Sequence, residues 1–311
     1  MTTTTFRQAQ DTAFETERGS GVRRVLGQSI PYVLLIISIL PIVIGYAWVI
    51  IATFSTRTQG LLPVDGQGNF GGLTLQNWSF LWDPAKREIW RVTLNTFGIA
   101  AGMVIGVGFV ATLAGYALAR MNFAGRKGFL GLTLALHAFR PEMLLIAIFF
   151  VLLFIKNNIP LIGGWFGFNT IGGVALVMIS LDLPLGIWLM KGFFDNIPWD
   201  MERSALIDGA SRFRVWWEII LPQIKPGIAA LAIFNFISGW NAFLIPYTFT
   251  IGAKVSNLPV YLNRFSEDTS MVSWNQVAAV GLFSLIPVMI FFIFTQEALL
   301  SIYSGGAKGG V

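Results

Sequence analysis

The sequence predicts an all-α, polytopic membrane protein with six transmembrane helices, and three observations support this fold class. Hydrophobic residues make up 55% of the 311 residues, while charged residues make up 12%, about half the share found in an average soluble domain. The mean hydropathy is +0.68. The third observation is a set of apolar runs about as long as the ~20 helical residues that cross a bilayer core. They lie at 30–54, 91–119, 128–155, 170–191, 226–249 and 276–302.

An even number of spans places both termini on the same side of the membrane, and the distribution of Lys and Arg predicts which side. With both termini in the cytoplasm, 13 of these residues lie inside and 7 lie outside, as the positive-inside rule requires. The basic residues between the second and third spans are expected to act as topology anchors; they are Arg120, Arg126 and Lys127.

The predicted organisation is a cytoplasmic tail at 1–29, a transmembrane domain at 30–303 and a second cytoplasmic tail at 304–311. The polar N-terminal stretch is too long to begin a cleaved secretory signal, so the first span is expected to remain in the protein. The expected location is the cell inner (plasma) membrane.

The composition excludes several classes of chemistry. The chain has no cysteine and one histidine, so disulfides, thiolate metal sites and metal clusters of several histidines cannot form. No GxxxxGK[ST] sequence is present, which excludes the usual phosphate-cradling loop. The net charge of +5 reflects the asymmetry across the membrane, so no nucleic-acid partner is expected.

The longest polar segment between two apolar spans is 198–227, which we call the coupling segment. Its pattern predicts two short helices joined at a glycine. Asp200 is expected to cap the first helix, Gly209 to adopt the left-handed conformation that ends it, and Ser211 to cap the second. Two prolines are expected to stop the second helix before the next span.

The coupling segment also carries a family resemblance. Asp208-Gly209-Ala210, with nine residues between Gly209 and Ile219, and then Ile219-x-Leu221-Pro222, resemble the EAA loop of the membrane subunits of ATP-driven, binding-protein-dependent importers. The resemblance implies the type I ABC importer permease fold, with this loop docked into a cleft of a cytoplasmic ATPase. The alternative is an ordinary helix-turn-helix in a cytoplasmic loop.

One position departs from the family motif. Where the motif usually has a glutamate, five residues before Asp208, this chain has Arg203, with Glu202 one place earlier. The expected ATPase-coupling residues are Glu202, Arg203, Ser204, Ala205, Asp208, Gly209 and Ala210.

Four ionisable residues lie at bilayer depth within the predicted spans: His137, Arg140, Glu142 and Asp182. A charge at bilayer depth costs about 2.5–3.5 kcal/mol on insertion scales, so each needs a structural or functional reason. They either pair with one another and stabilise the bundle, or face a translocation cavity where an arginine holds sugar hydroxyls or an anionic group. The sequence leaves both interpretations open.

The fifth predicted span combines amide, hydroxyl and indole side chains, a mixture suited to binding sugars by hydrogen bonds and ring stacking. Part of it also resembles the Trp-Asn-x-Phe-Leu pattern of the carbohydrate branch of the family. The alternative role is hydrogen bonding between helices. The expected substrate-pathway residues are Arg140, Glu142, Asp182, Asn235, Ser238, Trp240 and Asn241.

Together these resemblances, which include a C-terminal Gly305–Gly310 tail of the maltose type, imply a MalG-like permease subunit of a carbohydrate ABC importer. The implied partners are a MalF-like second permease, two cytoplasmic ATPases and a periplasmic or lipid-anchored solute-binding protein. No cofactor is expected on this chain, with ATP and Mg on the ATPases.

One alternative is a lone ion-coupled carrier using Arg140, Glu142 and Asp182, although no internal repeat supports it. Another is an intramembrane enzyme that uses the carboxylates of Glu142 and Asp182 as acid and base.

Overall fold

The computed structural model describes the backbone at residues 4–59, 62–64, 67, 69–83, 88–252, 255–267 and 273–306. The chain forms two units, Met1–Asn77 and Trp78–Val311. Most of the predicted C-terminal tail, 304–311, lies outside the described residues, because these end at residue 306.

The first unit contains one long helix and a β-hairpin. Helix α1, Thr4–Thr53, continues without interruption from the predicted tail into the first predicted span. Strands β1 (Arg57–Gln59) and β2 (Leu62–Val64) then pair antiparallel. The buried Asn77 side chain donates to the backbone oxygens of Thr53 (3.0 Å) and Ser55 (2.9 Å), which ties the end of the hairpin region to the end of the helix.

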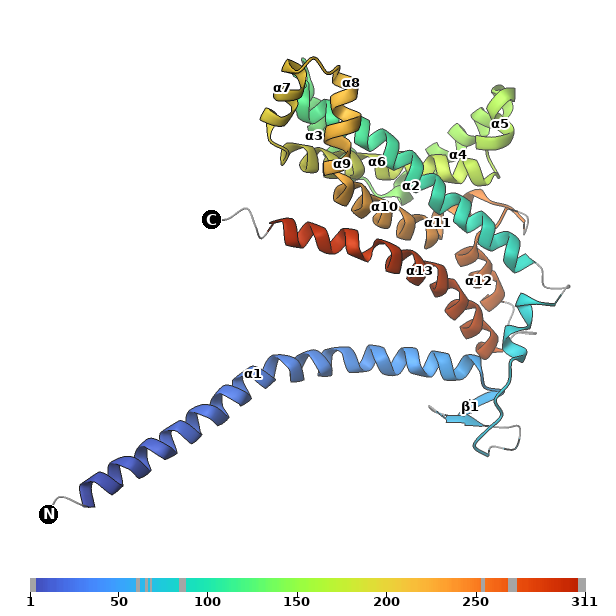
Figure 1. Cartoon of the computed structure of the whole chain (residues 1–311). Coiled ribbons are helices and arrows are strands. Elements are labelled where there is room, and N and C mark those ends of the chain that lie inside the picture. Colours follow the sequence, from blue (N-terminus) through green and yellow to red (C-terminus); the bar gives the residue numbers. More distant parts are fainter. Residues whose placement is uncertain are drawn as a thin grey trace. The chain divides into compact units, whose positions relative to one another are not determined.

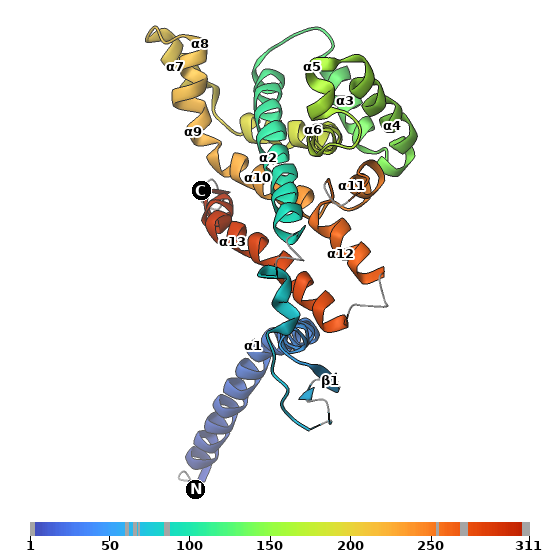
Figure 2. The same cartoon turned by 90° about the vertical axis from the view of Figure 1, so that its right-hand side faces the viewer.

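The second unit is built on three long helices: α2 (Glu88–Arg120), α6 (Ile171–Asp195) and α13 (Trp274–Gly306). A shorter helix, α10 (Lys225–Trp240), contacts all three. Helices α2 and α6 pack along each other, as Figures 1 and 2 show. The second, fourth and sixth predicted spans are therefore confirmed as continuous helices.

Glycines allow α2 and α6 to approach closely. A Cβ atom at Gly106 would lie 2.6 Å from the Ile179 side chain, and one at Gly115 would lie 2.9 Å from Cβ of Met190. At Gly115 the Lys191 backbone nitrogen would also lie 3.0 Å away, so only glycine fits there, whereas at Gly106 the end of the Ile179 side chain would have to shift. Close packing through small residues is how helices associate in lipid, where apolar side chains gain little by leaving the acyl chains.

The prediction of a continuous third span is wrong. The region forms α3 (Arg126–His137), α4 (Pro141–Asn158) and the short α5 (Pro160–Phe166). Pro141 has no amide hydrogen for a continuing helix and disfavours helical geometry in the residue before it. Arg140 is accordingly extended, with φ −72° and ψ 137°. Of these helices, α4 alone is long and apolar enough to cross a membrane.

The prediction of a continuous fifth span is also wrong. Helix α10 ends at Trp240, and α11 (Leu244–Phe249) follows after a break. At its other end α10 is bent by 71° from the helical segment Arg212–Gln223. By length and composition, the described residues contain five helices able to cross a membrane, or six if this bent pair counts as one span.

Helix α2 is long and apolar enough for its two ends to reach opposite sides of a membrane. Its 33 residues extend about 50 Å, longer than the ~30 Å hydrocarbon core. The coupling segment lies at the Arg120 end, whereas α12 (Leu258–Glu267) packs against the Glu88 end, as Figures 1 and 2 show.

Candidate functional site

The coupling segment forms two helical arms joined at a tight turn. The first arm is α7 (Trp199–Ile207), and the second runs through α8 (Arg212–Arg214), a π-helical turn η3 (Val215–Ile220) and α9 (Leu221–Gln223). The turn contains Gly209, whose φ of +88° lies in the left-handed region that favours glycine. The predicted helix–glycine–helix pattern is confirmed.

The two predicted caps have different outcomes. The Ser211 hydroxyl accepts a hydrogen bond from the Arg214 amide at 3.3 Å, so it caps the second arm as predicted. Asp200 does not cap the first arm, because α7 begins earlier, at Trp199, with Pro198 as its N-cap residue. Asp200 instead lies in the first turn, where its negative charge favours the positive end of the helix dipole.

The second arm ends at Gln223, between the two prolines that were expected to stop it, Pro222 and Pro226. Pro222 has no amide hydrogen to donate to the Glu218 carbonyl, and the preceding turn widens into the π-helix Val215–Ile220. The break falls at Ile224, and Pro226 then stands in the first turn of α10. A proline is tolerated there because the first helical amides have no partner within the helix.

A buried ion pair fixes the first arm to the end of α2. Arg120 Nε lies 2.5 Å from Glu202 Oε1, and the two side chains are only 3% and 8% exposed. Arg120 also donates from Nη2 to the Ile197 carbonyl at 2.7 Å and lies 4.5 Å from the Trp199 ring centroid. Tyr116 donates its hydroxyl to Glu202 Oε2 at 3.4 Å. Glu202 is therefore committed to contacts within the chain.

The other predicted coupling residues lie at or near the surface. Arg203, Ser204, Asp208 and Gly209 are exposed, while Ala205 and Ala210 are half-buried against the helical core. Arg203 takes part in none of the ion pairs found among the described side chains, and its guanidinium lies 6.0 Å from the Trp199 ring centroid. A cavity of about 160 Å³ lies between this arm and the end of α2.

Large apolar side chains project from the coupling segment. Ile207 at the end of α7 is 85% exposed, and Phe213 and Trp217 on the second arm are 71% and 58% exposed. Phe213 and Trp217 stack at 6.5 Å, and Trp216 contacts both rings. The opposite side of the same arm, at Val215 and Ile220, is buried in the core. The segment thus presents one packed side and one apolar, unpacked side.

Among the predicted pathway residues, the structure brings Asp182 and Ser238 together. Ser238 Oγ on α10 donates to Asp182 Oδ2 on α6 at 3.0 Å. His137, the last residue of α3, lies within electrostatic range of the same carboxylate. The sequence indicated His137 as an ionisable residue at bilayer depth but did not assign it to the substrate pathway.

Arg140 and Glu142 form no ion pair with Asp182 among the described side chains. Both side chains are exposed at the start of α4, and none of the ion pairs among the described side chains includes Arg140, Glu142 or Asp182. Among the described residues, the structure therefore contains no ion pair that would support the first interpretation of these charges.

The remaining pathway candidates, on α10, divide into buried and exposed positions. The buried Asn235 amide donates to the Leu231 carbonyl at 2.8 Å, and the buried Trp240 indole donates to the Ser284 carbonyl on α13 at 2.9 Å. Asn241, just beyond the helix end, is exposed and donates to Ile237 O at 3.0 Å.

The functional residue that sequence reasoning missed is Arg120. As the basic residue at the end of an apolar run, it had the features of a topology anchor and nothing more. Its role depends on Glu202, which lies 82 positions later in the chain, and no local pattern links the two. From the sequence alone, Glu202 was interpreted only as a glutamate one place before the position where the family motif usually has one.

The fold and site define a multi-pass helical membrane protein with a two-armed segment at one end of its central helix. Among the described side chains, no group of His, Cys, Asp and Glu could hold a metal ion. The chain belongs to the family of binding-protein-dependent transport system inner membrane components, whose model matches residues 111–301. It is therefore the permease subunit of an ABC importer, whose ATPase is a separate subunit.

Individual relatives support this assignment. The chain is 34% identical over 217 residues to the galactooligosaccharides transport system permease protein GanQ of Bacillus subtilis, covering 70% of this chain and 73% of that one. It is 29% identical over 289 residues to the maltodextrin transport system permease protein MalD of Streptococcus pneumoniae, covering 93% and 98%. These findings confirm the MalG-like importer interpretation over the lone carrier.

The fold also matches solved structures. A chain of a bacterial ABC transporter involved in the import of the acidic polysaccharide alginate superposes with a TM-score of 0.69 at 19% identity, covering 90% of this chain and 97% of that one. A chain of a bacterial alginate ABC transporter, in complex with an alginate pentasaccharide-bound periplasmic protein, gives a TM-score of 0.58 at 14% identity, covering 96% and 98%. The predicted permease fold is confirmed.

Proposed function

We propose that this chain forms half of a translocation pathway for a carbohydrate. Its partners would be a MalF-like second permease, two cytoplasmic ATPases that bind ATP and Mg, and a periplasmic or lipid-anchored solute-binding protein. Membership of the importer family supports the assembly. The names of the galactooligosaccharide and maltodextrin relatives support the substrate class.

The observation that carries the proposal is the architecture of the coupling segment. One side is locked to α2 by the buried Arg120–Glu202 pair, and the other presents exposed apolar side chains at Ile207, Phe213 and Trp217. An exposed aromatic cluster on a rigid support is the usual composition of a protein interface. We assign this surface to the ATPase, which places the segment and both termini in the cytoplasm.

We assign the sugar-contacting role on this subunit to Asp182, Ser238 and Asn241, with Arg140 and Glu142 at the start of α4. A carboxylate and an amide oxygen accept hydrogen bonds from sugar hydroxyls, and an arginine donates to them. Asn235 and Trp240 are buried and bonded to backbone carbonyls. The proposed role of Trp240 is to hold α10 against α13, whereas the Asn235 bond lies within α10.

The complex can be tested by purifying this chain from membranes and reconstituting it in vesicles with the external binding protein. We expect an ATPase to co-purify and its ATP hydrolysis to rise when a sugar-loaded binding protein is added. Screening sugars by this stimulation would identify the substrate. The proposal fails if no ATPase accompanies the chain, or if the chain alone carries out uptake driven by an ion gradient.

A prediction concerns Asp182. Replacing Asp182 with leucine removes the carboxylate that we propose accepts a hydrogen bond from the sugar. Loss of one charge-assisted hydrogen bond weakens binding by about tenfold or more. We expect sugar uptake by the reconstituted complex to fall by about that factor, with assembly and basal ATP hydrolysis preserved. Asp182→Asn, whose side-chain oxygen can still accept from Ser238, should retain more uptake.

The matched control for Asp182→Leu is Ser180→Leu on the same helix. Ser180 is exposed, and its hydroxyl is bonded to the Leu176 carbonyl of its own helix. Uptake should be close to normal in this variant. Equal loss in the two leucine variants, or normal uptake by Asp182→Leu, would remove Asp182 from the pathway.

A further inference from the structure

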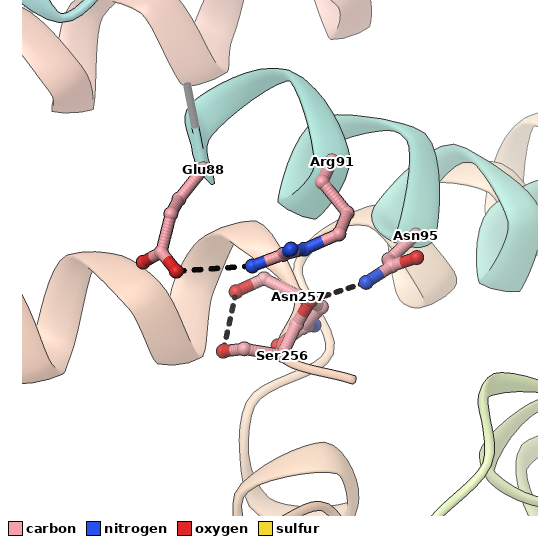
Figure 3. Close-up of polar contacts among 5 residues, drawn as sticks. All are labelled: Glu88, Arg91, Asn95, Ser256 and Asn257. Atoms are coloured by element: carbon pink, nitrogen blue, oxygen red, sulfur yellow. Dashed lines mark hydrogen bonds and ion pairs between the residues drawn. The ribbon is translucent and has the colours of Figure 1, made fainter. Parts of the chain in front are cut away.

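The loop between α11 and α12 ends in two fully enclosed polar residues. Ser256 and Asn257 are 1% and 0% exposed, although they lie in a connection rather than in a helix. Figure 3 shows them below the first turns of α2. Polar groups buried this completely require hydrogen-bond partners, and the partners belong to two different parts of the fold.

The first set of partners is on α2. The Asn95 side chain donates to the Ser256 carbonyl at 2.9 Å, as Figure 3 shows. The Leu258 amide donates to the buried Thr96 hydroxyl at 2.7 Å. These two bonds attach the end of the loop to a long helix of the core.

The second set of partners is at the break between α10 and α11. Asn257 donates from Nδ2 to the Ala242 carbonyl, at the break, at 2.6 Å. Its Oδ1 accepts from the Val260 amide in the first turn of α12 at 3.3 Å. Ala242 directly follows Asn241, the exposed amide just beyond the end of α10. Carbonyls at a helix end lack partners within the helix, and broken helices in membranes need such groups satisfied by other parts of the protein.

The beginning of the same loop is accessible. Ile251 is 67% exposed, and Gly252 has a φ of +84° that favours glycine. The Ile251 amide donates to Asn169 Oδ1 at 2.7 Å. The loop therefore has an exposed start and a buried end, and it lies at the end of α2 remote from the coupling segment, where an external protein would approach.

We propose that Asn257 is a positioning residue for transport: it joins the outer loop to the break after α10 and so sets the position of Asn241. The inference rests on the proposed function, in which Asn241 contacts sugar and a binding protein docks outside. Contact of that protein with the loop displaces the Ala242 carbonyl through Asn257, and the break changes its shape. The Asn95–Ser256 and Leu258–Thr96 bonds hold the loop on α2.

The test compares Asn257→Ala with Asn95→Ala in the complete complex, reconstituted in vesicles. Each variant removes an asparagine side chain that holds the same loop. The Asn95 side chain donates to the Ser256 carbonyl, whereas the Asn257 side chain donates to the Ala242 carbonyl at the break. The readout is the ratio of ATP hydrolysis with and without sugar-loaded binding protein, beside the basal rate and the yield of assembled complex. Coupling between two sites commonly amounts to about 5–150-fold. We expect at least a fivefold loss of stimulation, on the order of that lower limit, in Asn257→Ala, and near-normal stimulation in Asn95→Ala.

Three results would overturn the inference: normal stimulation in Asn257→Ala, equal loss in both variants, or a parallel loss of basal hydrolysis and assembly that marks a purely structural role. Asn257→Ser provides a second variant, since a hydroxyl retains a donor. It should recover part of the stimulation if the variant assembles. If the wild-type complex is itself not stimulated by any binding protein, the proposed function fails, which is distinguishable from failure of the inference.

Discussion

Replacing Arg120 with methionine should destabilise the protein by about 3–5 kcal/mol, because it leaves the Glu202 carboxylate buried without its partner. The pair is almost fully enclosed, at 3% and 8% exposure, so water cannot compensate the charge. We expect the first arm of the coupling segment to detach from α2. Thermal unfolding of the purified complex and retention of the ATPase during purification would measure the two effects.

The matched control is Arg126→Met. Arg126 lies six residues later, and its recorded side-chain bond is to the exposed Asn122. We expect little change in this variant, since exposed polar contacts contribute little. The double variant Arg120→Met/Glu202→Met should be more stable than Arg120→Met, because it removes the stranded charge. If Arg120→Met were as stable as Arg126→Met, the ion pair would not hold the coupling segment.

The second large effect is expected at Gly239, where α10 crosses α2. A Cβ atom there would lie 2.7 Å from the Ala100 Cα and 2.9 Å from the Met103 sulfur. The backbone of α2 cannot move aside as a flexible side chain would, so Gly239→Val should force the helices apart. Overpacking typically costs about 1–3 kcal/mol and occasionally more. We expect little assembled complex, measured as the yield of monodisperse protein after extraction.

Gly108→Val provides the control in the same pair of helices. A Cβ at Gly108 meets no atom within 4 Å, and added apolar volume on that side faces away from the crossing. Its yield should match the wild type. Similar yields for the two valine variants would show that close approach of α2 and α10 is not required for assembly.

The elements that the sequence predicted best depend on local chemistry. The continuous spans are set by apolar length, the turn at Gly209 by its positive φ, and the cap at Ser211 by its hydroxyl. Each of these can be inferred from a few neighbouring residues. The resemblance of the coupling segment to the EAA loop required only the residues and spacing between Asp208 and Pro222.

The wrong or missing predictions concern features that local sequence rules cannot determine without the rest of the fold. Pro141 and Pro246 lie within the predicted third and fifth spans, but α4 begins at Pro141 and the fifth span breaks before Pro246. Hydropathy counts apolar residues and does not record whether a helix continues through them. The Arg120–Glu202 and Asp182–Ser238 pairs join residues far apart in the chain, so they depend on how helices pack, which one sequence does not contain.

The central claim is that the apolar side of the coupling segment contacts a cytoplasmic ATPase. The chain contains no cysteine, so a single cysteine can be introduced at Phe213 for cross-linking in intact membranes, with Ile251→Cys at the opposite end of the bundle as control. The account predicts that Phe213→Cys cross-links to an ATPase subunit and reacts with impermeant reagents only from the cytoplasmic side, whereas Ile251→Cys reacts only from outside. Labelling of Phe213→Cys from outside, or the absence of any cross-link to an ATPase in a transport-competent complex, would contradict it.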